Sequence, residues 1–136
     1  MRAVSVQDTL VYVMVCISAS DNVMGETELL RIGNVTKMLP VFDGYTSDQL
    51  INATRVCTDI LQEDEGMMTV IGMAAELPDN LRRTAYALAA EIAASDRKVS
   101  SEEIRFLQLL RSHLQIGKLR AAALEEAAIA RHQVEG

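Results

Sequence analysis

The sequence contains few of the residues that build sheets or interrupt helices. It has no tryptophan, three tyrosines, two phenylalanines, two prolines and seven glycines among 136 residues. Aromatic residues favour strands, whereas proline and glycine break helices. Leu, Ala, Ile, Val and Met dominate instead. This composition predicts an all-α protein, and the length predicts a single domain over residues 1–136.

Basic clusters and long apolar runs are also missing. The net charge is −6, and no run of Lys or Arg occurs. Such a chain is poorly suited to bind nucleic acid, an anionic membrane surface or an oxyanion. No stretch reaches the ~18 apolar residues that a membrane span needs, so we expect no membrane insertion.

Cysteine is scarce, and its spacing is uninformative. Cys16 and Cys57 form no CxxC pair. Their number permits a disulfide, but we expect two small buried thiols in a reducing compartment. This interpretation favours a cytoplasmic protein.

The N-terminus superficially resembles a signal peptide. Arg2 precedes an apolar run at residues 10–17, and small residues follow at 18–20. Asp8, however, occupies a region that should be positively charged. We therefore interpret this stretch as a helix, because it also forms part of an internal repeat.

Residues 16–28 and 91–103 are two copies of one pattern, separated by 75 positions. The matched pairs are Ile17 with Ile92, Ala19 with Ala94, Ser20 with Ser95, Asp21 with Asp96, Met24 with Val99, and Glu28 with Glu103. Each copy predicts a helix, a short acidic turn and a second helix. Repeats constrain the fold, and these units cover roughly residues 10–39 and 84–114.

About seven helices are expected from apolar periodicity and from helix start and stop signals. They cover approximately residues 6–19, 26–39, 46–62, 67–76, 78–94, 100–114 and 118–132. We expect the two repeated hairpins to pack with pseudo-two-fold symmetry, which would bring both acidic turns to one side.

The last two helices have predicted core faces. In the sixth, these residues are Ile104, Leu107, Leu110 and Leu114. In the Ala-rich seventh, they are Leu119, Ala122, Ala123, Ala127 and Ala130. Met67, Met68 and Met73 are interpreted as adaptable core residues rather than as a soft-metal site.

The second copy resembles a known family. Residues 85–96, AYALAAEIAASD, together with 99–104 and 107–110, resemble the tellurite-resistance TerB family and its TerB-like relatives. The resemblance extends from about Leu10 to His132. It implies an all-helical fold with an acidic surface cluster, a role in the response to tellurite and related stresses, and proposed metal-ion binding. It implies no established enzymatic activity. The family often has Asp-Gly in the turn, whereas Asn22 and Arg97 follow the aspartates here.

The repeated carboxylates are candidate metal ligands. Asp21 and Glu28 form one pair, and Asp96 and Glu103 form the other, with Glu91 assisting the second. Oxygen ligands suit Ca²⁺ or Mg²⁺. The spacing is not that of an EF-hand, and no CxxC or HxxxH pair indicates zinc.

Helix capping is the alternative explanation for the same acids. Residues 100–103 form a capping box, in which Ser100 accepts from one amide and Glu103 reaches back to another. At residues 25–28 only half of this arrangement is possible, because Gly25 has no side chain and only Glu28 could reach back to an amide. Both explanations remain open from the residues alone.

The leading hypothesis is a non-enzymatic, cytoplasmic stress-response module that binds a divalent cation and engages a protein partner. Membrane-associated stress-response proteins are candidate partners. Carboxylates repel the tellurite anion, so we expect no direct tellurite binding. The alternative is a pure protein–protein interaction domain whose acids only cap helices. A metal-dependent hydrolase is less favoured, since no motif marks a water-activating base.

Overall fold

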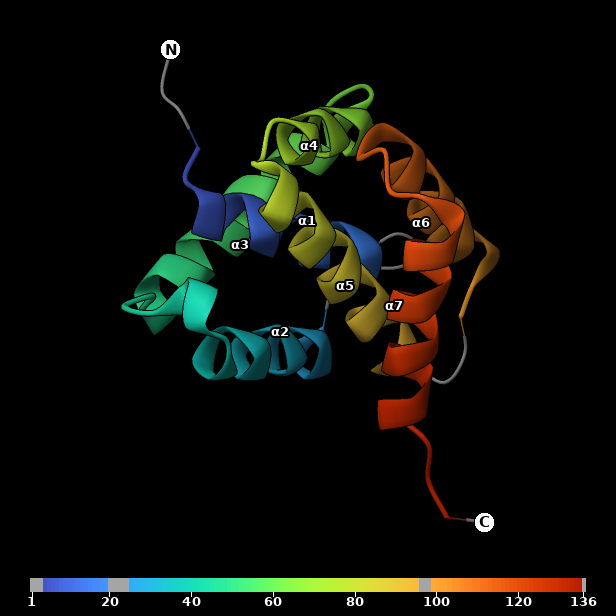
Figure 1. The fold of residues 1–136 in the computed structure, drawn as a ribbon. Coiled ribbons are helices and arrows are strands. Elements are labelled where there is room, and N and C mark those ends of the chain that lie inside the picture. The colour runs from blue at the N-terminus through green and yellow to red at the C-terminus, as the bar shows by residue number, and fades with distance from the viewer. Residues whose placement is uncertain (1–3, 20–24, 96–98, 136) are drawn as a thin grey trace.

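The structure is a computed structural model, and it describes residues 4–19, 25–95 and 99–135. The helices are α1 (Val6–Ser18), α2 (Glu26–Met38), α3 (Ser47–Leu61), α4 (Gly66–Ala75), α5 (Asp79–Ser95), α6 (Ser101–His113) and α7 (Lys118–Arg131), with a short 3-10 helix η1 (Pro40–Phe42) (Figure 1). These residues contain seven α-helices and no strand, which confirms the all-α prediction.

Helix α1 lies at the centre of the molecule. Residues 9–17 are all buried, and α1 contacts α2, α3, α4, α5 and α6. A helix that is apolar on every side must be covered on every side. Ser5 caps its start, because the Ser5 hydroxyl accepts from the Asp8 amide at 3.0 Å. The apolar run at residues 10–17 therefore forms the core of the fold.

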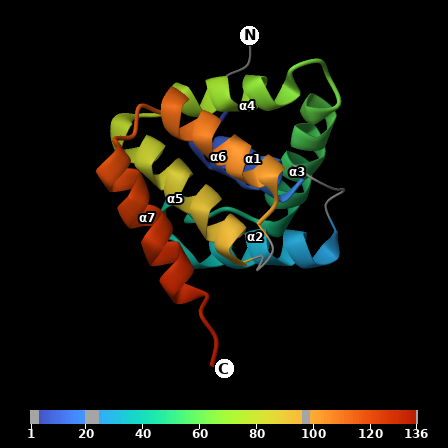
Figure 2. The same ribbon diagram turned by 90° about the vertical axis from the view of Figure 1, so that its right-hand side faces the viewer.

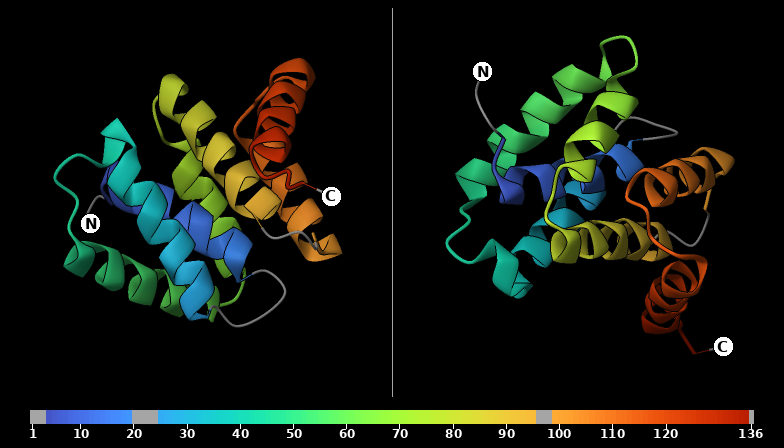
Figure 3. Two further views of the ribbon diagram at one scale, coloured as in Figure 1. Left: turned by 90° about the horizontal axis from the view of Figure 1, so that it is seen from below. Right: turned by 45° about the horizontal axis from the view of Figure 1, so that its top comes forward.

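Helix α5 is the second central element. It packs against α1 on one side and carries α6 and α7 on others (Figure 2). Alanines at 85, 89, 90 and 93 are buried and allow close approach of neighbouring helices. Figures 1 and 3 show that α1 and α5 run in similar directions and end on the same side. The pseudo-two-fold relation of the hairpins stays a prediction.

Several boundaries follow from local chemistry. Helix α3 begins with the expected capping box: the Gln49 amide donates to the Thr46 hydroxyl at 3.1 Å, and the Thr46 amide donates to Gln49 Oε1 at 2.7 Å. Pro40 follows the end of α2 and starts η1. The turn between α3 and α4 needs Gly66, because a Cβ there would lie 2.1 Å from the Ile60 carbonyl oxygen.

Two predicted core faces are partly wrong. Ile104 on α6 is 47% exposed, although Leu110 and Leu114 are buried as expected. On α7, Leu119 is 86% exposed, and the buried residues are Ala121 and Ala128. The faces of an Ala-rich helix are similar in apolar area. The sequence of such a helix therefore only weakly indicates which face is buried. Contacts from α5 to α7, described below, select the face.

The remaining core predictions hold. Met67, Met68 and Met73 are partly buried against the main core. Cys16 and Cys57 are free, buried thiols, and Cys57 Sγ donates to the Tyr12 carbonyl at 3.6 Å. A hydrogen bond with Cys57 and burial raise the pKa of the Cys16 thiol. In the described part of the chain, every helix is too short or too polar to cross a membrane.

Candidate functional site

The five predicted metal ligands fall into two groups. Asp21 and Asp96 lie outside the residues that the structure describes. Glu28, Glu91 and Glu103 lie on α2, α5 and α6 respectively. Glu103 and Glu91 have hydrogen-bond partners within the protein, and Glu28 lies beside Gly25.

Glu103 caps the start of α6. Its side chain is almost fully buried, and its Oε1 accepts from the Ser100 amide at 3.0 Å. In return, the Glu103 amide donates to the Ser100 hydroxyl at 3.1 Å. This geometry confirms the capping box predicted from residues 100–103. The role of Glu103 as a metal ligand stays a prediction.

Glu28 occupies the corresponding place at the start of α2. The N-terminal cap is Gly25, which has no side chain to offer. Glu28 Oε2 lies only 3.1 Å from the position that a Cβ on Gly25 would take. The carboxylate thus lies beside the helix N-terminus, where the helix dipole favours negative charge. Glycine at position 25 leaves the space that this arrangement needs.

Glu91 joins α5 to the C-terminal end of α7. Its Oε1 accepts from Arg131, with the Nε at 2.9 Å, and its Oε2 pairs with Nε2 of His132. Burial alone would raise the pKa of the Glu91 carboxyl, but the hydrogen bonds and charges of Arg131 and His132 outweigh it. The pKa therefore lies below its ordinary value. Both oxygens have partners within the protein.

Among the described residues, no group of three or more His, Cys, Asp or Glu side chains is arranged to hold a metal ion. The predicted cluster also includes Asp21 and Asp96, which the structure does not describe. The three carboxylates that are described lie on different helices: Glu103 completes a capping box, Glu91 forms an interhelix ion pair, and Glu28 lies beside Gly25 at the start of α2.

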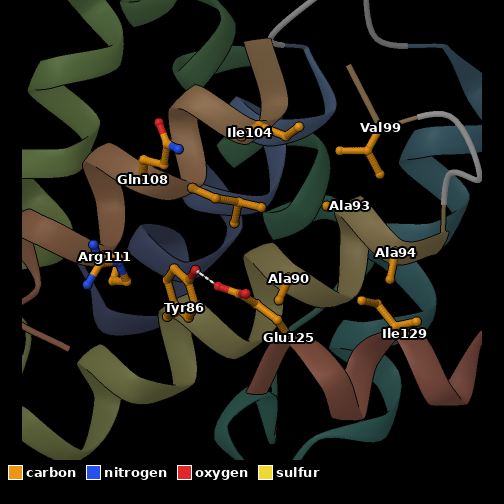
Figure 4. Close-up of a pocket in the computed structure, with 11 residues that line it drawn as sticks. Tyr86, Ala90, Ala93, Ala94, Val99, Ile104, Gln108, Arg111, Glu125 and Ile129 are labelled. Carbon is orange, nitrogen blue, oxygen red and sulfur yellow. Dashed lines mark hydrogen bonds between the residues drawn. The ribbon is translucent and has the colours of Figure 1, made fainter. Parts of the chain in front are cut away.

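A groove lies between α5, α6 and α7, with a cavity volume of about 290 Å³ (Figure 4). Helix α5 forms its floor, and α6 and α7 form its walls. The lining residues are Tyr86, Ala90, Ala93, Ala94, Val99, Ile104, Leu107, Gln108, Arg111, Glu125 and Ile129. We refer to this surface as the α5–α6–α7 groove.

One end of the α5–α6–α7 groove is polar. The buried Tyr86 hydroxyl donates to Glu125 Oε2, joining the floor to one wall (Figure 4). Burial, followed by the hydrogen bond to Glu125, raises the pKa of Tyr86 above its ordinary value, and the nearby Arg111 charge opposes this rise. Among the described residues, Arg111 forms no ion pair.

The other end is apolar and open to solvent. Ala90, Ala93 and Ala94 line the floor. Val99, Ile104 and Ile129 form the rim and are 44%, 47% and 47% exposed. Isolated exposed aliphatic residues are ordinary, but a group around a concave surface is typical of a binding site.

Sequence reasoning missed this groove. Tyr86 and Glu125 are separated by 39 positions, and only the packing of α7 on α5 brings them together. The spacing of Ile104 matches the buried face of α6 and therefore predicts a core position, which is wrong. A partial signal existed in the second half of α7, where Ile129 is the one large aliphatic residue among the alanines and charged residues of 125–131.

Comparisons of the chain with protein-family models, with curated proteins and with solved structures found no match. The TerB resemblance therefore stays an interpretation of the sequence.

Proposed function

We propose that this protein is a non-enzymatic helical module that acts by binding a partner protein, in the kind of tellurite or related stress response that its TerB-like sequence implies. The α5–α6–α7 groove is the observation that carries this proposal. It combines exposed aliphatic side chains with a polar end in one concave surface. Such surfaces are typical of binding sites.

The positions of the described acids also favour an interaction module. Glu103 completes a capping box, Glu28 lies beside the start of α2, and Glu91 is paired with Arg131 and His132. Glu103 and Glu91 contribute hydrogen bonds that hold helices in place. Structural roles at helix ends and between helices can therefore explain why acids occur at these three positions without a metal ion.

A divalent cation site remains the second candidate. Helices α1 and α5 pack together and end on the same side (Figures 1 and 3). Asp21 and Asp96 follow the ends of these helices in the sequence. With Glu28 and Glu103, they would offer oxygen ligands suited to Ca²⁺ or Mg²⁺. Tellurite itself would be repelled by these carboxylates.

Calorimetric titration of the intact protein with Ca²⁺ and Mg²⁺ distinguishes the two candidates. The interaction module predicts no heat beyond that of an Asp21→Asn/Asp96→Asn control. It also predicts no chemical-shift change at residues 19–28 and 94–103. Binding heat that disappears in the control would establish the cation site instead.

Site-specific photo-crosslinking tests partner binding directly. A photoreactive residue is placed at Ile104, Ile129, Leu30 or Ile51, which are exposed aliphatic positions, or at the exposed control Glu63. In the native cells under tellurite stress, we expect Ile104 and Ile129 to crosslink to one discrete protein and Glu63 to give none. The purified pair should bind, and Ile104→Glu should abolish binding. Absence of crosslinks at every aliphatic position would contradict the interaction module.

A further inference from the structure

The α5–α6–α7 groove has a counterpart elsewhere in the molecule at the spacing of the internal repeat. Subtracting 75 from Ala94, Ile104 and Ile129 yields Ala19, Leu29 and Thr54, which all line a cavity of about 440 Å³ between α2 and α3. Ile129 lies on α7 and Thr54 on α3, so the correspondence reaches one helix beyond each repeated hairpin. In both places the third helix packs against the first.

The polar end of the groove also has a counterpart, but of different chemistry. Gln108, Arg111 and Glu125 correspond to Gly33, Thr36 and Leu50. These three line an adjoining cavity of about 300 Å³ between α2 and α3. The α2–α3 cavity thus has small or apolar residues at the three positions where the α5–α6–α7 groove has an amide, a cation and an acid. Gln108 is exposed, and Arg111 and Glu125 are half-buried. A partner that covers these groups must satisfy them, because leaving them buried and unpaired would cost free energy.

The shape of the α5–α6–α7 groove fits a helix better than a small molecule. Val99, Ile104 and Ile129 are almost half exposed, and their outward surfaces rise along the rim. A small ligand filling the cavity would leave those surfaces in water, whereas a helix laid across the walls would cover them. The alanine floor at 90, 93 and 94 lets such a helix approach closely.

The charges at the polar end indicate what that helix should carry. Glu125 Oε2 already accepts from Tyr86, whereas Arg111 forms no ion pair among the described residues. The guanidinium is therefore one charged group available to a partner. A single acidic side chain at this end would satisfy it, but a strongly acidic segment would be repelled by the net charge of −6.

We propose that the α5–α6–α7 groove binds an amphipathic helix of a partner protein, with aliphatic residues on Ile104, Ile129 and the alanine floor and one acidic side chain paired with Arg111. This inference rests on the interaction function proposed above. It adds the surface, the secondary structure of the partner and the position of its charge. The adjoining α2–α3 cavity has Thr36 at the position that corresponds to Arg111, and its cation, Lys37, is the next residue along α2.

Synthetic helical peptides of about 16 residues test the proposal, since shorter helices are marginal in water. The probe carries Leu at positions i, i+3, i+4 and i+7, with either Glu or Lys at the end that faces Arg111. Titration into the isotopically labelled full chain should shift the amides of Ala93, Ile104 and Ile129. The Glu peptide should bind about tenfold more tightly than the Lys peptide.

A charge exchange supplies the decisive comparison. Arg111→Glu should invert the preference, so that the Lys peptide binds more tightly than the Glu peptide. Leu30→Glu and Ile51→Glu, at exposed positions beside the α2–α3 cavities, should leave both affinities unchanged. Circular dichroism verifies that every variant keeps its helices.

Three results would overturn the inference: no amide shifts along the groove, equal affinity for the two peptides, or displacement of the Glu peptide by sodium decanoate with the same amide shifts. The last result would identify a small amphiphile as the occupant. Crosslinks from Leu30 or Ile51 without peptide binding at Arg111 would overturn this inference but not the interaction function. They would show that the partner binds at the α2–α3 cavities. Absence of both crosslinks and peptide binding would remove both proposals.

Discussion

At the scale of single residues, the described acids show how one pattern serves several structural tasks. Glu28 and Glu103 are matched in the repeat, and each lies at the N-terminus of a helix. Glu91 has Cys16 as its counterpart, and the two residues have different environments. Cys16 is buried in the central helix, whereas Glu91 pairs with Arg131 and His132. Equivalent sequence positions therefore have different roles.

Glu91→Gln should loosen the end of α7. The Arg131 side chain is 55% exposed, so solvent limits the loss to about 0.5–1 kcal/mol in the free energy of unfolding. The native pKa of Glu91 lies below its unfolded value of about 4.3, so the stabilisation is present above that pH and declines as pH falls through the native pKa. Urea unfolding at neutral and acidic pH measures this difference.

Glu126→Gln is the matched control, because Glu126 is an exposed acid on α7. Its effect on unfolding should be within about 0.5 kcal/mol at either pH. A Glu91→Gln variant as stable as the wild type at neutral pH would show that the ion pair with Arg131 contributes nothing to docking of α7.

At the scale of elements, helix starts and turns follow local chemistry closely. Thr46 and Gln49, like Ser100 and Glu103, form the capping boxes that their spacing predicts. The turn into α4 is less regular. Glu65 adopts a left-handed backbone with φ of 56°, and Gly66 lies against α3. Close contact between the backbones of α3 and α4 explains why glycine is needed there.

Gly66→Ala should destabilise the protein by about 1–3 kcal/mol, since its Cβ would collide with the Ile60 carbonyl and force the turn to shift. Gly72→Ala is the control on the same helix, because no neighbouring atom lies within 4 Å of its added Cβ. Alanine there should stabilise by up to about 1 kcal/mol. Chemical denaturation of both variants tests the pair, and equal effects would contradict the packing argument.

At the scale of the whole molecule, α1 holds the other helices together. It contacts five of the other helices, including α5 from the second repeat unit. Because neither unit can bury its central helix alone, we expect the chain to unfold in one cooperative transition. For the same reason, replacing a buried side chain of α1 by a smaller one should lower the stability of the whole protein.

Leu10→Ala should reduce the free energy of unfolding by about 2–5 kcal/mol, because Leu10 is completely buried in α1. Circular dichroism and tyrosine fluorescence should still report coincident transitions, since the tyrosines lie at the first, third and fifth helices or beside them. Leu119→Ala, at an exposed position of α7, should change stability by less than about 0.5 kcal/mol. Separate transitions from the two probes would show that the repeat units unfold independently.

The sequence alone determined the helical class, the approximate ends of the helices and the capping boxes. These features depend on residues within a few positions of one another, such as Ser100 and Glu103. The burial of α1 was also predictable, because residues 10–17 are almost entirely apolar. Local periodicity and hydrogen bonding carry this information without help from distant parts of the chain.

Only the tertiary structure decided which face of α7 is buried and where the α5–α6–α7 groove lies. An Ala-rich helix has little apolar contrast, so the contacts of Glu125 with Tyr86 and of Arg131 with Glu91 select its face. The same docking leaves Ile104 and Ile129 on an open rim instead of in the core. Sequence spacing identifies which residues share a helix face, but the neighbouring helices decide whether that face is covered.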